Sequence, residues 1–161
     1  MATAVASRPA RRLGQLDFVV MSVYWVAIGY LWNSMGLLVV PYLVEHLVGK
    51  QLEGTATALM ENLGTVVAIV WQPLAGAISD RTRTRWGRRR PFIFIGTLGD
   101  AVFLTAIALS GAYLPLVAGY VLLQLASNTA QGPYQGMLPD LVPEAQKGTA
   151  SGYYGASNLV G

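Results

Sequence analysis

Three stretches of this 161-residue sequence are almost free of charged side chains, and each is long enough to cross a lipid bilayer. Residues 18–44 contain no charged residue, residues 55–79 contain only Glu61, and residues 91–139 contain only Asp100. A helix needs about 20 predominantly apolar residues to cross about 30 Å of hydrocarbon. The sequence therefore predicts a chain that crosses the membrane several times.

The third stretch is too long for a single crossing. It contains the segment Ser-Gly-Ala-Tyr-Leu-Pro at residues 110–115, whose Gly and Pro favour a turn. We therefore predict an all-α, polytopic transmembrane helical bundle with four complete helices and the start of a fifth. The expected organisation is a cytoplasmic basic tail at residues 1–16 and a transmembrane bundle at 17–161, with spans at about 18–44, 55–79, 91–109, 116–138 and 148–161, the last one truncated.

The composition excludes several classes of protein. Hydrophobic residues make up 53% of the chain and charged residues 12%, about half of the ~25% that is typical of soluble domains. The mean hydropathy of +0.46 argues against a disordered chain as well. Because the chain has no cysteine and only one histidine, His46, it lacks the residues for a disulfide, a thiol nucleophile or a clustered metal site. We therefore expect no enzyme, no cofactor and no metal.

The positive charges lie on one side of the predicted membrane. Ten of the eleven Lys and Arg residues fall in the N-terminal tail and in the loops after the second and fourth spans, and only Lys50 falls on the other side. Positive charge accumulates on the cytoplasmic side of membrane proteins, so we predict a cytoplasmic N-terminus in a plasma or inner membrane. The arginines then face anionic lipid headgroups, and no nucleic-acid partner is expected.

Polar side chains recur at helical spacing in three of the predicted spans. At 100° per residue, the amides of the fourth span fall within an arc of roughly 60°, and the first and second spans each present a stripe of polar and small residues. Polar groups inside a bilayer usually face a protein interior or a water-filled path. We interpret the stripes as the lining of a shared aqueous cavity. The candidates for contact with a solute are Trp25, Asn33, Gln72, Gln124, Asn128, Gln131 and Gln135.

Helix packing is the alternative explanation for these residues. Amide side chains hydrogen-bond between neighbouring helices, and small residues allow helices to approach closely. The indole of Trp25 is able to stack on a sugar ring, but tryptophan in membrane helices is often a packing or interfacial residue. The sequence leaves both alternatives open.

Two carboxyl groups lie inside the predicted spans. Glu61 is about one turn from the outer edge, where its side chain can stay hydrated. Asp100 lies nine residues after Pro91, about 13 Å along a helix and therefore near the bilayer midplane. A carboxyl group that loses its water there favours the neutral form unless a cation pairs with it. Both residues are candidates for coupling to a proton or a sodium ion, and a hydrogen-bonded, structural Asp100 is the alternative.

Six arginines lie between Arg81 and Arg90, in the loop that joins the second and third spans. Asp80 precedes them, Gly76 one turn earlier permits close helix packing, and Gly87 permits a tight turn. Charge-assisted hydrogen bonds within such a cluster can hold a cytoplasmic gate shut. Anchoring at the cytoplasmic surface explains the charge of the loop but not the Gly-x-x-x-Asp-Arg spacing.

This loop resembles a signature of the major facilitator superfamily, in which Gly-x-x-x-Asp-Arg and then Gly-Arg-Arg join helices two and three. The five residues between the two halves of the motif, residues 82–86, are similar to the sucrose-transporter-like branch, which is related to the glycoside-pentoside-hexuronide:cation symporters. The segment at 128–154, which begins Asn-Thr-Ala-Gln-Gly-Pro, is similar to the end of helix four in that branch. The matching gate residues are Gly76, Asp80, Arg81, Gly87, Arg88 and Arg89.

The resemblance implies roles for particular residues and for the chain as a whole. It implies that Asp80, Arg81 and Arg88 belong to an inner gate, and that Asp140, at the cytoplasmic end of helix four, pairs with a gate arginine. The branch often has an arginine where this chain has Gln135. The resemblance also implies that the chain is the N-terminal half of a twelve-helix major facilitator fold, with the C-terminal bundle absent.

We therefore predict secondary active transport, in which alternating access moves a sugar or a similar small polar solute together with a cation. The expected partners are the solute, a proton or a sodium ion, the lipid bilayer and the missing C-terminal half. The alternatives are a truncated, structural or regulatory membrane module that does not transport, and a facilitator for a solute other than a sugar.

The 161-residue chain alone is expected not to transport, because alternating access needs a second bundle to move against. The measurement is solute uptake into proteoliposomes that contain only this chain, with protein-free liposomes as the control. Robust and saturable uptake would contradict the expectation.

Overall fold

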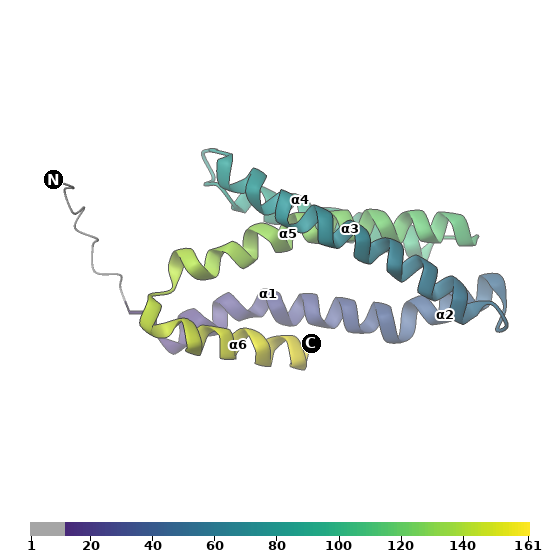
Figure 1. Cartoon of the computed structure of the whole chain (residues 1–161), viewed down its shortest axis with the longest axis horizontal. Helices are drawn as coiled ribbons and strands as arrows, with labels where there is room; N and C mark the ends of the chain where they lie inside the picture. The colour runs from purple at the N-terminus through teal and green to yellow at the C-terminus, as the bar shows by residue number, and fades with distance from the viewer. Residues whose placement is uncertain (1–11) are drawn as a thin grey trace. The chain divides into compact units, whose positions relative to one another are not determined.

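The structure is a computed structural model that describes residues 12–161, apart from the side chains of residues 138 and 139. Over these residues the chain is helical and contains no strand, which confirms the predicted all-α helical bundle. Most of the predicted basic tail lies outside the described residues. The elements are α1 (Gln15–Ser34), the π-helical η1 (Met35–Val39), α2 (Val40–Val48), α3 (Glu53–Arg81), α4 (Arg90–Ala108), α5 (Tyr113–Leu141), the 3-10 helix η2 (Glu144–Gln146) and α6 (Lys147–Val160) (Figure 1).

Several of these helices are long enough to cross a membrane. Among the described residues, three helical segments are both long and apolar enough: Gln15–Val48, Glu53–Arg81 and Arg90–Ala108. Helix α5 has 29 residues, so at 1.5 Å per residue it is also longer than a hydrocarbon core of about 30 Å. The chain thus has the helices of a membrane protein.

A proline explains the change of helix type inside the segment Gln15–Val48. Pro41 has no N–H to donate to the carbonyl oxygen of Leu37, and its ring crowds the preceding turn. The backbone at Met35–Val39 adopts a π-helical turn, which accommodates the missing hydrogen bond. The α-helix resumes at Val40.

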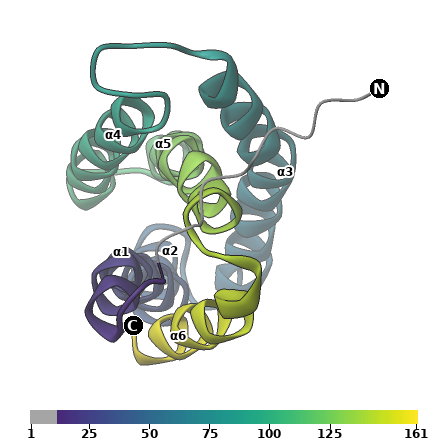
Figure 2. The same ribbon diagram turned by 90° about the vertical axis from the view of Figure 1, so that its left-hand side faces the viewer.

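The described residues form two compact units, residues 12–34 with 138–161 and residues 35–137. In the first unit α1 and α6 lie side by side (Figures 1 and 2). A Cβ atom added at Gly29 of α1 would lie 3.0 Å from the carbonyl oxygen of Asn158 in α6. The two helices therefore touch through their backbones, which only a glycine at this position permits without a shift.

Further contacts join the start of α1 to the segment around η2 and α6 in the first unit. Phe18, Val142 and Ala150 form its buried apolar cluster. The amide of Gln146 accepts a hydrogen bond from the backbone N–H of Leu13 at 3.0 Å and donates one to the Leu13 carbonyl oxygen at 2.9 Å. This reciprocal pair fixes the chain just before α1 to the η2 turn.

Glycines also set the packing of α5 against α3 and α4 in the second unit (Figure 2). A Cβ atom added at Gly96 of α4 would lie 2.6 Å from the carbonyl oxygen of Ala126 in α5. One added at Gly132 of α5 would overlap the carbonyl oxygen of Gln72 in α3, whereas one at Gly76 would meet Gly132 at an ordinary 3.6 Å. From the sequence, Gly76 was expected to permit close helix packing, but the closest approach of α3 and α5 depends on Gly132.

The variant Gly132→Ala is expected to unfold at a lower temperature than the unmodified chain. Its new methyl group meets the backbone of α3, and such overpacking costs about 1–3 kcal/mol of stability. Gly54→Ala is the matched control, because Gly54 also lies in a helix and a Cβ there would meet nothing within 4 Å. Thermal unfolding in detergent measures both variants, and equal transition temperatures would contradict the packing described here.

Candidate functional site

Arg89 is the arginine of the loop whose side chain links α3 to α5. Its Nη2 atom donates a hydrogen bond to Oδ1 of Asp80 at 3.0 Å, and its Nη1 atom donates one to the carbonyl oxygen of Pro133 at 2.8 Å. The side chain of Arg89 is 13% exposed and that of Asp80 is 52% exposed. A Cβ atom added at Gly136 would overlap the guanidinium group, so this glycine leaves the space that Arg89 fills. Arg89 therefore joins the last turns of α3 to α5.

The field of the helices favours a cation at this position. The C-terminal end of an α-helix carries a partial negative charge, and Asp80 lies in the last turn of α3. A planar guanidinium can donate to two acceptors at once, which an ammonium group does with less geometric control. The bridge thus combines an ion pair, a hydrogen bond and the dipole of α3.

Short-range hydrogen bonds shape the loop that carries Arg89. The Thr84 hydroxyl donates to the carbonyl oxygen of Gly87 at 2.6 Å, and the Gly87 N–H donates to the carbonyl oxygen of Thr84 at 3.1 Å. Gly87 has a φ of +95°, which residues with a side chain rarely adopt. The Ser79 hydroxyl donates to the carbonyl oxygen of Arg88 at 3.2 Å. These bonds turn the chain between α3 and α4 and position the residue that follows Arg88.

The structure gives each residue of the predicted gate a definite place. The ion pair described for Asp80 is with Arg89, while Arg81 and Arg88 have exposed side chains. Asp140 is exposed near the end of α5, and its pairing with a gate arginine stays a prediction. The Pro133 carbonyl oxygen and Gly136 were missed by the sequence analysis, because a backbone acceptor and an empty space leave no charge pattern.

The amide stripe of α5 forms hydrogen bonds within its own helix. Gln124, Asn128 and Gln131 are buried, whereas Gln135 is exposed. The Nδ2 atom of Asn128 donates to the carbonyl oxygen and to Oε1 of Gln124, at 2.7 and 3.1 Å. The Nε2 atom of Gln131 donates to Oγ of Ser127 at 2.9 Å. The buried amides are therefore hydrogen-bonded without a solute.

The other predicted cavity residues lie on α1 and α3. Gln72 and Glu61 are half-buried on α3, and Asn33 is exposed on α1. Next to Gln72, the indole N–H of Trp71 donates to Oγ1 of Thr129 in α5 at 2.8 Å, an interhelical bond that the sequence analysis missed. Because α1 belongs to the first unit and α3 and α5 to the second, a cavity shared by the three stripes stays a prediction.

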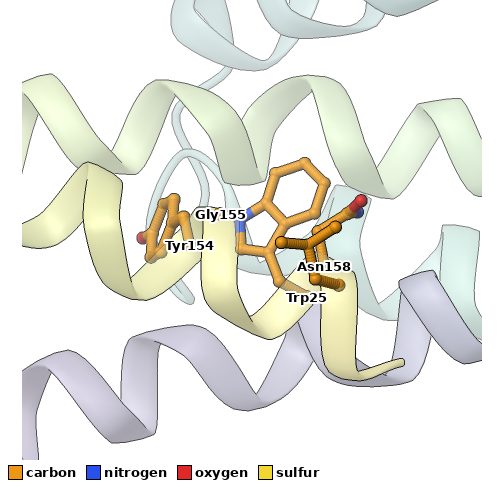
Figure 3. Close-up of a pocket in the computed structure, with 5 residues that line it drawn as sticks. Trp25, Tyr154, Gly155 and Asn158 are labelled. Carbon is orange, nitrogen blue, oxygen red and sulfur yellow. The ribbon is translucent and has the colours of Figure 1, made fainter.

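Trp25 of α1 lines a pocket of about 490 Å³ in the first unit (Figure 3). The centroids of the Trp25 and Tyr154 rings are 6.0 Å apart and their planes are tilted by 48°, within the range of favourable aromatic pairs. In Figure 3 the indole lies between the Tyr154 ring and the Asn158 side chain. The other lining residues are Gly155 and Leu159.

This aromatic pocket suits a small ring-shaped solute that carries hydroxyl groups. Ligand sites of proteins are mostly apolar hollows of about 300–1,000 Å³ with a few polar groups that fix orientation. The apolar face of a sugar ring can lie on an aromatic side chain, and the amide of Asn158 both donates and accepts hydrogen bonds. Trp25 was predicted from the sequence, whereas Tyr154 and Asn158 were not, although their spacing of four residues places them on one face of α6.

Apolar helices of membrane-crossing length, a buried amide stripe and an arginine-bridged loop together are the features of a polytopic membrane protein. The family described as "MFS/sugar transport protein" matches residues 21–161. The chain therefore belongs to this family, which confirms the resemblance seen in the arginine loop.

Curated relatives support the same assignment. The sucrose transport protein SUC3 of Arabidopsis thaliana is 30% identical over 113 residues, which make up 56% of this chain and 19% of that protein. The sucrose transport protein SUT1 of Oryza sativa subsp. japonica is 29% identical over 147 residues, 78% of this chain and 27% of the rice protein. Solute carrier family 45 member 4 of Mus musculus is 35% identical over 103 residues, 55% of this chain and 13% of the mouse protein. The chain thus spans no more than about a quarter of these relatives, and no solved structure matches it significantly.

The variant Arg89→Lys is expected to weaken the link between α3 and α5. A lysine cannot reproduce the two directed bonds of the guanidinium, and each hydrogen bond to a charged group contributes about 1.5–3 kcal/mol. Thermal unfolding in detergent should show a lower transition temperature than for Arg83→Lys, which changes an exposed arginine of the same loop. Equal effects of the two substitutions would leave the arginines with an anchoring role only.

Proposed function

We propose that the chain is the N-terminal part of a secondary active transporter that moves a sugar or a similar small polar solute. The observation that carries the proposal is the match of residues 21–161 to the MFS/sugar transport protein family. Two of the relatives above are named as sucrose transport proteins, which supports a sugar as the solute. Because the chain spans only a small part of each relative, the second helical bundle would come from residues beyond this sequence or from another chain.

The arginine bridge supports alternating access as the mechanism. Arg89 links the end of α3 to α5 through two hydrogen bonds, and the Gly132 contact brings the same helices together nearby. Opening of this side would require the two bonds to break and the helices to separate, while closure would restore them. The loop would thus act as the cytoplasmic gate of a chain whose N-terminus is cytoplasmic, in a plasma or inner membrane.

The aromatic pocket and the amide stripe support a polar solute. Trp25 offers a flat apolar surface and Asn158 a bifunctional amide, which together match the two kinds of surface on a sugar ring. The buried amides of α5 offer further donors and acceptors that could exchange their intrahelical bonds for bonds to hydroxyl groups. Coupling to a cation would let the solute accumulate against its gradient, with Asp100 and Glu61 as the carboxyl groups inside the helices.

In the complete transporter, Trp25→Ala is expected to raise the apparent KM for sucrose by about two- to tenfold, because a favourable aromatic contact is worth about 0.5–1.5 kcal/mol. The measurement is saturable uptake of radiolabelled sucrose into proteoliposomes. Trp86→Ala is the matched control, since Trp86 is an exposed residue of the loop between α3 and α4.

A second pair of variants tests the polar side of the pocket. Asn158→Ala should raise KM by a comparable factor through the loss of a hydrogen bond to the solute. Asn62→Ala should not, since Asn62 lies on α3, outside the lining of this pocket, and donates to the carbonyl oxygen of Ala58. Unchanged kinetics in Trp25→Ala and Asn158→Ala would remove the pocket from the binding site. A complete transporter that takes up no mono- or disaccharide would refute the proposed function itself.

A further inference from the structure

Asp100 is a buried acidic group without a partner among the described residues. It lies in the middle of α4, its residue is 5% exposed, and its Oδ1 atom is inaccessible and accepts no hydrogen bond from any described group. Glu61, the other carboxyl group within the uncharged stretches predicted to cross the membrane, is only half-buried. Asp100 is therefore the acidic side chain of the described helices that is most isolated from water.

Asp100 lies on the face of α4 that packs against α5. Gly99, its neighbour in the chain, would meet the Cβ atom of Ala126 at 2.8 Å if it carried a Cβ of its own. Two turns further along, a Cβ atom added at Gly119 of α5 would lie 3.0 Å from the buried side chain of Ile107. The two helices are in contact on both sides of Asp100, so its carboxyl group lies at a tight helix interface.

The charges around this interface offer no cation to Asp100. The basic residue of α4 is Arg90, ten residues away and thus about 15 Å along the helix, and α5 contains no Lys, Arg or His. The ionisable groups of α5 are three tyrosines and one aspartate. Tyr113 donates to the carbonyl oxygen of Ala56, Tyr120 packs at Gly64 of α3, Tyr134 is buried, and Asp140 is exposed near the helix end.

The polar groups of α5 are already engaged. Ser127 accepts from Gln131, and Asn128 donates to Gln124, so these side chains form bonds along their own helix. A hard metal cation takes several oxygen ligands, and the described part of the chain holds no group of three or more Asp, Glu or His residues that could supply them. A proton needs only the carboxylate itself.

The energetic comparison favours a neutral side chain. An ionised carboxylate that is buried without a cation or hydrogen-bond donors is strongly disfavoured, whereas the protonated acid carries no net charge to desolvate. Proton release from this position would require water or a cation to reach the carboxyl group, and an opening of the α4–α5 interface would provide that access. Proton binding and helix packing at this interface are thus linked.

We infer that Asp100 is a proton-binding site in the membrane-spanning part of the chain and, on the basis of the proposed function, that it carries the coupling proton. The protonated side chain is compatible with the closed α4–α5 interface, and the ionised side chain with an interface opened to water. Because α5 also carries the amide stripe and accepts the Arg89 bond, movement at this interface reaches both the buried amides and the Arg89 bridge.

Infrared spectroscopy of the full 161-residue chain in lipid nanodiscs tests the proton site without any transport measurement. A protonated Asp100 gives a carboxylic C=O stretching band at neutral pH that shifts in D₂O. The band should be absent from Asp100→Asn, which has the size and shape of the neutral acid and should retain the helix packing. It should remain in Asp140→Asn, whose carboxylate is exposed. A folded chain without the band, or a band that sodium chloride removes and potassium chloride does not, overturns the proton site.

The coupling role is tested separately in the complete transporter. A gradient of one pH unit can drive sugar accumulation by up to about tenfold, and Asp100→Asn should reduce this accumulation to about one while sugar exchange without a gradient continues. Accumulation that still follows the proton gradient in Asp100→Asn overturns the coupling role. If the unmodified transporter moves no sugar but the infrared band is present, the proposed function fails and the proton site stands.

Discussion

Backbone contact at glycine positions is the constraint on which the helix packing of this protein depends. Lipid tails are as apolar as leucine, so helices in a membrane gain little from burying leucine and valine against each other and associate through close packing and hydrogen bonds. Many large apolar side chains of the described helices are accordingly exposed, while Gly29 and Gly132 lie against the backbone of a neighbouring helix. Each unit is held by such a contact, at Gly29 between α1 and α6 and at Gly132 between α3 and α5.

Helix α5 takes part in the arginine bridge, the amide stripe and the packing around Asp100 in the second unit. It provides the carbonyl oxygen of Pro133 to Arg89, the space at Gly136 for the guanidinium and the glycine that touches α3. The same helix carries the buried amide stripe and packs against the face of α4 that contains Asp100. A helix moves largely as a rigid rod, so a displacement at one of these places is felt at the others. This arrangement gives the proposed gate, solute contacts and proton site a common mechanical element.

The sequence predicted the fold because the signals for membrane helices are long and redundant. Uncharged stretches of about 20 residues, and prolines and glycines between them, are enough to indicate an all-helical bundle. The contacts of the arginine loop were harder to predict. Six arginines share one short loop, and nothing in their spacing shows that Arg89 is the one that reaches both Asp80 and a backbone carbonyl. Such a choice depends on where the turn at Gly87 places the chain, which is a three-dimensional property.

The candidate solute site illustrates a different limit of the sequence. Trp25 was recognised because it stands on a polar stripe of a long apolar segment, whereas Tyr154 and Asn158 lie in a 14-residue helix among glycines and serines. The contact between Gly29 and the backbone at Asn158 brings the two segments together, and no periodicity within either segment reveals it. The burial of the amides on α5 was likewise not visible, because a stripe at helical spacing is the same whether it faces water or another helix.

The second unit contains two aspartates, Asp80 and Asp100, whose different surroundings give the same type of side chain different roles. Asp80 is half exposed at a helix end and is paired with a guanidinium, so its charge is compensated and its role is to hold two helices together. Asp100 lies in mid-helix, has no described partner and is closed off by the packing of α4 on α5. A charge in that place would weaken the very contact that buries it, whereas a neutral acid would not. The interface is therefore sensitive to a single proton at Asp100 in a way that the arginine bridge is not.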